Sequence, residues 1–72
     1  MGLLKSILII DDEENIRTYL GRALAKDGFD VLTAQYGKEG LNLLTRKPVD
    51  IVLLDLNLPD IHGLDVLKEI LN

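Results

Sequence analysis

The amino-acid sequence predicts an α/β fold of three β/α units, with a parallel sheet and helices on both of its faces. Two observations support this prediction. Short apolar segments alternate with stretches whose apolar residues recur at helical spacing, and the connections between them are short. Such alternation favours right-handed crossovers, which join neighbouring parallel strands through a helix. We assign residues 1–72 to this one unit and expect no second domain.

The first β/α unit begins with the apolar segment 6–10, which is typical of a strand buried on both faces. This segment ends abruptly at Asp11 and Asp12. A helix should follow, because apolar residues then recur at i, i+4, i+7 and i+8, namely at Ile16, Leu20, Ala23 and Leu24. Its end is predicted at Gly28, since glycine readily adopts the left-handed conformation found after helices.

The second and third units repeat this pattern. Residues 29–34 predict a strand, and a helix that includes Leu41 and Leu44 should end before Pro48. Residues 49–54 contain the most apolar run of the chain, which is typical of a strand covered on both faces. After a polar loop, a third helix is predicted from the apolar stripe Leu64, Leu67, Ile70 and Leu71.

Composition excludes several classes of protein. The net charge is -4 and no basic stripe is present, so direct contact with nucleic acid is not expected. The chain has no cysteine, which excludes disulfides and thiolate zinc sites. No apolar run approaches the roughly 18 residues of a membrane span, and we expect a cytoplasmic protein. Met1-Gly2 followed by Ser6 formally fits the N-myristoylation pattern, but a short unmodified lead is the favoured interpretation.

Acidic residues follow two of the predicted strands. Asp11 and Asp12 come after the first strand, and Asp55 ends the third. Sites in open α/β sheets lie at the carboxyl ends of strands, and neighbouring strands are about 4.8 Å apart, so the three carboxylates should converge. Two unit charges 4 Å apart repel by about 4 kcal/mol at an effective dielectric of 20, which favours a proton or a bound cation. These oxygen donors suit Mg²⁺, with Mn²⁺ as a second possibility, although Asp12 could simply cap the first helix.

Two segments of the sequence resemble the receiver domains of two-component response regulators. They are Ile9-Ile10-Asp11-Asp12-Glu13 and Leu53-Leu54-Asp55-Leu56-Asn57-Leu58-Pro59-Asp60-Ile61-His62-Gly63. The acid pair, the aspartate after the third strand, the proline and the glycine have the order and spacing of that family. Residues 15–17 and 24–28 are most similar to transcription activators of the nitrogen-regulator type. The resemblance identifies the chain as the first half of a flavodoxin-like receiver, with strand order 2-1-3. We assign Pro59 and Gly63 to the shape of the loop that follows the third strand.

The resemblance also implies roles for individual residues. Asp55 is similar to the aspartate that accepts a phosphoryl group from a sensor histidine kinase. Asp12 resembles the direct Mg²⁺ ligand, Asp11 the acid that binds the metal through water, and Asn57 the residue whose main-chain carbonyl completes the site. We therefore expect a signalling module whose intact parent regulates an output such as transcription, and not an enzyme. A phosphatase is disfavoured because Asn57 cannot supply the proton that such enzymes take from a second acid.

A complete receiver continues through two more strands and helices, which carry a Ser or Thr and a Lys that contact the phosphoryl group. We therefore expect a chain truncated before these switch residues. The third strand then becomes an edge, and its apolar composition predicts a homodimer through this strand, with a six-stranded sheet of undecided strand direction. The alternative is an engineered or proteolytic half-domain that dimerises without phosphotransfer.

Overall fold

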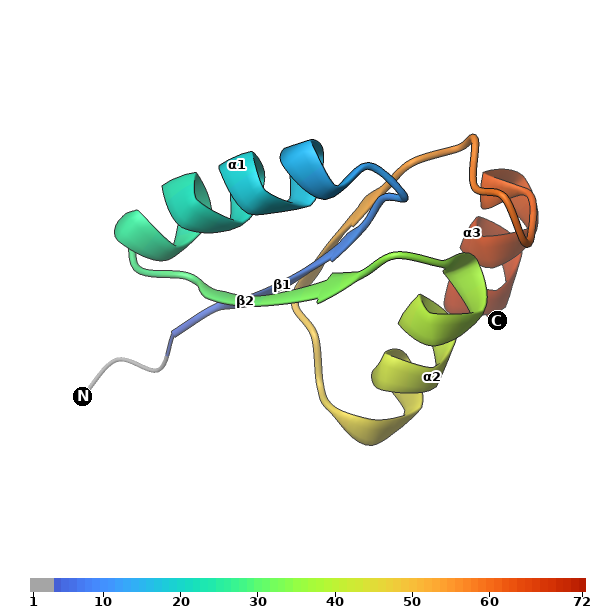
Figure 1. Cartoon of the computed structure of the whole chain (residues 1–72). Helices are drawn as coiled ribbons and strands as arrows, with labels where there is room; N and C mark the ends of the chain where they lie inside the picture. Colours follow the sequence, from blue (N-terminus) through green and yellow to red (C-terminus); the bar gives the residue numbers. More distant parts are fainter. Residues whose placement is uncertain (1–3) are drawn as a thin grey trace.

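Three parallel strands form a sheet that lies between helices on its two faces (Figure 1). The computed structural model describes residues 4–72, so the myristoylation pattern at Met1-Gly2 lies outside the described residues. The elements are β1 (Ser6–Ile10), α1 (Glu14–Lys26), β2 (Asp30–Ala34), α2 (Gly37–Arg46), β3 (Ile51–Leu54) and α3 (Gly63–Leu71). Their strand order is β2-β1-β3, which confirms the prediction. No helix within the described residues has the length and hydropathy needed to cross a lipid bilayer.

The central strand β1 forms the middle of the core. Residues 7–10 are at most 3% exposed, because β1 pairs with a strand on each edge and is covered on each face. Successive side chains of a strand point to opposite faces. Leu8 and Ile10 accordingly pack with Ala34 and Val66 in the core that α2 and α3 cover. The predicted strand buried on both faces is confirmed for β1.

Glycines fix two features of the helices. Gly28 has φ of 96°, a left-handed conformation that strains other residues, and α1 ends just before it, as predicted. Gly37 starts α2 and is buried against α3, where an added Cβ would lie 2.9 Å from Val66 Cγ2. The first turn of α2 can therefore approach α3 closely only while residue 37 has no side chain.

The apolar stripe predicted for the first helix is only partly right. Leu20 and Leu24 are half-buried against the sheet, but Ile16 is 39% exposed and Ala23 is exposed. No residue of α1 is fully buried. The reason is that α1 lies along β2 and β1 and leaves β3 uncovered, so only a narrow strip of the helix meets the sheet.

The stripe predicted for the third helix is largely wrong. Val66 is fully buried and Ile70 is half-buried, whereas Leu64, Leu67 and Leu71 are exposed. α3 is apolar on two faces, and the spacing of its residues does not say which face meets the sheet. Its inward face is the one that packs on α2.

The third strand is shorter and more open than predicted. β3 begins at Ile51, not at residue 49, and it lies at the edge of the sheet. Val52 and Leu54 pack against the core under α3, but Ile51 and Leu53 on the other face are 40% and 38% exposed. The expectation of a strand covered on both faces is therefore wrong for this face within residues 4–72.

Two aspartates outside the acidic cluster connect distant parts of the chain. Asp60, in the loop after β3, accepts hydrogen bonds from the backbone N–H groups of Gly37 (2.9 Å) and Lys38 (3.0 Å) at the start of α2. Asp50 accepts hydrogen bonds from the backbone N–H (2.7 Å) and hydroxyl (3.2 Å) of Ser6, joining the entries of β3 and β1. The hydrogen bond from the Lys38 N–H is the main cause that lowers the pKa of Asp60, and the one from the Ser6 N–H lowers the pKa of Asp50.

These two lowered pKa values predict a loss of stability in acid. A carboxyl whose pKa is lower in the folded chain stabilises it above the unfolded pKa of about 3.9, and this contribution is lost as the pH falls through the folded value. We expect the urea midpoint, followed by circular dichroism, to fall from about pH 5 downwards. Asp60→Asn should reduce this fall, and Asn42→Ala, on the exposed side of α2, should leave it unchanged. An equally steep fall in Asp60→Asn would contradict this assignment.

Candidate functional site

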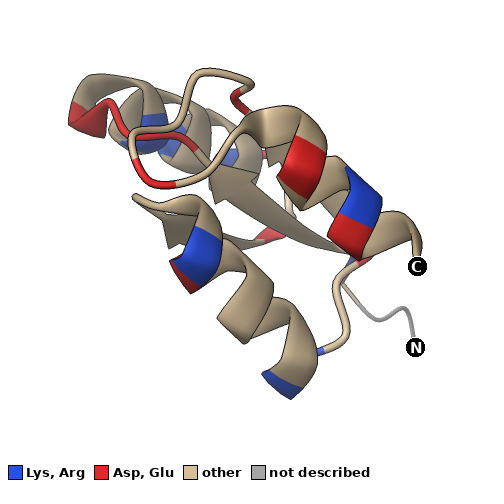
Figure 2. Cartoon of the chain, turned by 90° about the vertical axis from the view of Figure 1, so that its right-hand side faces the viewer, with Lys and Arg blue, Asp and Glu red and all other residues tan. Residues whose placement is uncertain are grey.

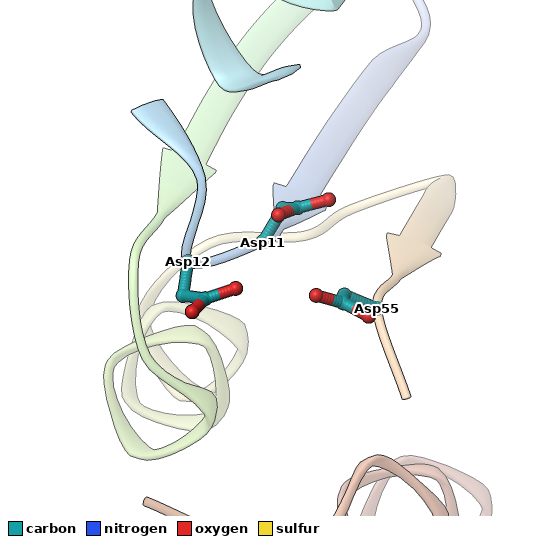
Figure 3. A group of neighbouring side chains, drawn as sticks. All are labelled: Asp11, Asp12 and Asp55. Atoms are coloured by element: carbon teal, nitrogen blue, oxygen red, sulfur yellow. The ribbon is translucent and has the colours of Figure 1, made fainter. Parts of the chain in front are cut away.

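Three carboxylates meet at the carboxyl ends of β1 and β3. Oxygen atoms of Asp11, Asp12 and Asp55 lie within 4.8 Å of one another, and the three side chains are half-buried (Figure 3). Ile10 and Leu54 are in register, so the residues that follow them emerge at the same rim of the sheet. The backbone pairing continues one residue further, because the Asp55 N–H donates to the Ile10 carbonyl (2.9 Å). The predicted convergence of the three acids is therefore found in the structure.

Asp11 is held on both its side chain and its main chain. Its Oδ1 accepts the backbone N–H of Glu13 at 2.9 Å, and its carbonyl accepts a hydrogen bond from Arg17 Nη1 at 2.8 Å. Glu13 is the N-cap residue of α1, so the interpretation of Asp12 as the cap is wrong. The turn into α1 is thus stabilised by Asp11, and the Asp12 side chain points into the cluster (Figure 3).

Asp55 is oriented by the loop that follows it. Its Oδ1 accepts the backbone N–H of Asn57 at 3.0 Å, a short turn in which an aspartate binds the backbone two residues on. Asn57 is exposed and lies beside the cluster through this bond. The structure brings together the side chains of Asp11, Asp12 and Asp55, and the role of the Asn57 carbonyl stays a prediction.

Gly63 has a larger part in the site than loop shape alone. It is buried at the first position of α3, and its N–H donates to the Leu56 carbonyl at 3.3 Å. An added Cβ would lie 2.8 Å from the Asp55 carbonyl oxygen and would overlap the backbone of Leu56. The close approach of α3 to the segment that carries Asp55 therefore requires glycine. Arg17 and Asp60 also support the site, and the sequence did not predict them. The hydrogen bonds that Asp60 accepts join segments far apart in the chain, and the hydrogen bond that Arg17 donates goes to a main-chain carbonyl.

The donor set determines which ion the site can hold. Within residues 4–72, the cluster consists of three carboxylates with no nitrogen or sulfur ligand among them. Hard divalent cations such as Mg²⁺ prefer oxygen ligands, and a cation between the acids would relieve their repulsion. The residues present therefore fit a hard divalent metal.

Comparisons with known proteins agree with this geometry. The model of the response regulator receiver domain family matches residues 7–72. The alkaline phosphatase synthesis transcriptional regulatory protein PhoP of Bacillus subtilis is 41% identical over 66 residues, which are 92% of this chain and 28% of that protein. Regulatory protein AtoC of Escherichia coli is 39% identical over 69 residues, 96% of this chain and 15% of that protein, and is of the nitrogen-regulator-like type.

Solved structures show the same similarity. The response regulator TrrA of Thermotoga maritima, in complex with Mg²⁺ and BeF, superposes with a TM-score of 0.89 at 42% identity, over 93% of this chain and 58% of that one. TrrA in complex with the histidine kinase ThkA superposes with a TM-score of 0.88 at the same identity and coverage. The chain thus spans a little over half the length of these solved relatives.

The contact at Gly63 predicts that Gly63→Ala destabilises the fold. Overpacking of this kind costs about 1–3 kcal/mol, because the Asp55–Leu56 backbone has to move away from the new methyl group. Urea unfolding at neutral pH measures the change in free energy. The neighbouring Leu64→Ala is the control, since Leu64 is 59% exposed and its truncation should change stability by less than about 0.5 kcal/mol. Equal stabilities of the two variants would refute the requirement for glycine.

Proposed function

The chain belongs to the response regulator receiver domain family of two-component systems, and on this basis we propose that Asp55 is its phosphoryl acceptor. The observation that carries the proposal is the position of Asp55. Its carboxylate lies at the rim of the sheet, within 4.8 Å of the carboxylates of Asp11 and Asp12. A phosphoryl donor can reach this rim from solvent, and the neighbouring acids can hold the cation that an incoming anion requires.

In this proposal Asp11, Asp12, Asp55 and the Asn57 carbonyl would hold Mg²⁺; by resemblance to the family, Asp12 would be the direct ligand and Asp11 would act through water. Mn²⁺ is the expected substitute, since it also prefers oxygen ligands. When bound, the metal neutralises the acids and the phosphoryl oxygens. The Mg²⁺ and BeF complex of TrrA supports this assignment by similarity.

The chemical step is a phosphoryl transfer to a carboxylate. An oxygen of Asp55 forms a bond to the phosphorus of a phosphohistidine, the P–N bond breaks, and its electron pair stays on the imidazole nitrogen. The product is an acyl phosphate on Asp55. The Asn57 N–H, which already donates to Asp55 Oδ1, orients the carboxylate before the reaction. The chain accepts one phosphoryl group and does not act as an enzyme with turnover.

We assign the donor to a sensor histidine kinase in the cytoplasm, and the complex of ThkA with TrrA supports this partner class. We take residues 1–72 as the first half of a receiver whose parent controls transcription, since the similar PhoP is named as a transcriptional regulatory protein. The net charge of -4 argues against direct contact of this part with nucleic acid. The family match and the assembled cluster favour this function over a half-domain without phosphotransfer.

Phosphorylation is tested with acetyl phosphate and Mg²⁺, followed by intact mass. We expect the mass of one added phosphoryl group in the wild type and its loss in Asp55→Asn, because the amide is not a nucleophile of this kind. Asp65→Asn, on the exposed side of α3, should be phosphorylated like the wild type. An adduct that survives in Asp55→Asn, or none in the wild type, would refute the assignment of Asp55.

Metal binding is tested separately, by titration with Mg²⁺ in a calorimeter and with Mn²⁺ by electron paramagnetic resonance. Asp12→Asn should weaken binding by at least about tenfold, because it removes a charged ligand from a site of three acids. Asp30→Asn removes the same charge at the start of β2, at the other end of the sheet, and should bind like the wild type. Equal affinities of these two variants would show that the ion is not held at the cluster.

A further inference from the structure

The guanidinium of Arg17 binds the main chain next to the acidic cluster. Its Nη1 donates to the Asp11 carbonyl oxygen at 2.8 Å, in a partly buried hydrogen bond. That oxygen belongs to the peptide group that joins Asp11 to Asp12. A guanidinium carries a full positive charge, and a hydrogen bond from a charged donor is about twice as strong as one between neutral groups. Arg17 therefore holds the link between two of the three acids.

The backbone is also fixed on both sides of this peptide group. On one side, the Asp11 N–H donates to the Ala34 carbonyl of β2 at 3.0 Å. On the other side, the N–H of Glu13, the N-cap residue of α1, donates to Asp11 Oδ1 at 2.9 Å. The peptide group between Asp11 and Asp12 lies beyond the last residue of β1. The hydrogen bond from Arg17 fixes its orientation.

The orientation of this peptide group affects the site because a peptide group is planar. A rotation of the plane moves the Cα atom and the side chain of Asp12 with it. The carboxylates of Asp11, Asp12 and Asp55 lie within 4.8 Å of one another and repel, and such a rotation would relieve the repulsion by moving Asp12 away. The hydrogen bond from Arg17 opposes the rotation. The Asp12 carboxylate therefore stays directed at the cluster (Figure 3).

The acceptor that Arg17 uses leaves the three carboxylates available to a cation. The hydrogen bond goes to a main-chain carbonyl and occupies no carboxylate oxygen. Figure 2 shows the acidic residues in red and the basic residues of α1 in blue. As a charge, a guanidinium beside the cluster repels a bound cation. As a donor, it holds the ligands in place, so its two effects change the affinity for a cation in opposite directions.

We propose that Arg17 is a positioning residue of the metal site, which holds the peptide group between Asp11 and Asp12 so that both carboxylates face a divalent cation such as Mg²⁺. This inference rests on the proposed function, because it takes the cluster as the place where Mg²⁺ binds. Arg17 acts through the two acids, and we assign it no contact with the ion. Removal of a residue that orients metal ligands typically weakens binding by about 10- to 100-fold.

Calorimetric titration of Arg17→Met with Mg²⁺ tests this role, at neutral pH and about 0.15 M salt, where the Debye length is about 8 Å. Methionine keeps an unbranched apolar side chain but has no donor. We expect the dissociation constant to rise by about tenfold, because the two acids are no longer held. A charge effect alone would lower the dissociation constant, because the variant removes a positive charge beside the site. An unchanged or lower dissociation constant would therefore overturn the proposal.

Two controls on α1 separate this role from net charge and from helix stability. Arg22→Met removes the same charged group from an exposed position of the helix, and it should bind Mg²⁺ like the wild type. Ala23→Gly weakens the helix at an exposed position and should also bind like the wild type. Circular dichroism confirms that each variant is folded. If either control weakened binding as much as Arg17→Met, the loss would come from charge or stability and the proposal would be overturned.

Arg17→Lys tests the same hydrogen bond in a variant that keeps the charge, and it serves if Arg17→Met does not fold. The lysine ammonium can donate to the same carbonyl, although it lacks the planar shape of the guanidinium. We expect its Mg²⁺ affinity to lie close to that of the wild type, because a donor is retained. A loss of about tenfold or more in folded Arg17→Lys would overturn the proposal.

Failure of this proposal can be distinguished from failure of the proposed function. Mg²⁺ binding by the wild type that is weakened in Asp12→Asn supports the metal site itself. In that case, equal affinities of the wild type and Arg17→Met would overturn only the role of Arg17. If the wild type bound no Mg²⁺, both the metal site and the role of Arg17 would be overturned.

Discussion

The burial of β1 is the constraint on which the rest of the structure depends. Residues 7–10 are at most 3% exposed: β2 and β3 pair with this strand, α1 and α2 pack on it, and Val66 of α3 joins its core. A shift of one residue would exchange the two faces of the strand and bring Asp11 into the core, at a high cost in desolvation. The apolar run therefore fixes both the register of the sheet and the point at which the acids begin. The position of the metal site follows from the hydrophobic core and not from the acids themselves.

The loop after β3 connects the acidic cluster to the two helices on one face. Asp55 receives the Asn57 N–H, Asp60 binds the first N–H groups of α2, and Gly63 lets α3 begin directly against the Asp55–Leu56 segment. A displacement of the Asp55 backbone would therefore also move the first residues of α2 and α3. The three acids of the cluster give the site its negative charge. Gly63 and Asp60 fix the position of the backbone that carries Asp55.

The sequence predicted the strand order, the element types and the convergence of the three acids. The strand order came from the resemblance to receiver domains. The element types and the convergence of the acids follow from apolar runs and from which residue comes directly after a strand, and both are local properties of the chain. The supporting contacts could not be predicted in this way. The hydrogen bond from the Gly37 N–H to Asp60 Oδ1 spans 23 residues, and the one from Arg17 goes to a main-chain carbonyl, which leaves no mark on the pattern of residue types.

The errors of the sequence reasoning share a physical cause. Helical spacing showed that α3 is apolar, but Val66 and not Leu64 or Leu67 meets the core, because a helix that is apolar on two faces has no preferred side. The composition of β3 indicated cover on both faces, and only one face is covered within residues 4–72. The side chains of a strand alternate between its two faces, so the apolar composition of β3 could not show that one face would be exposed. The mismatches at β3 and on Leu67 of α3 lie around one edge of the sheet, in a chain that spans a little over half the length of its solved relatives.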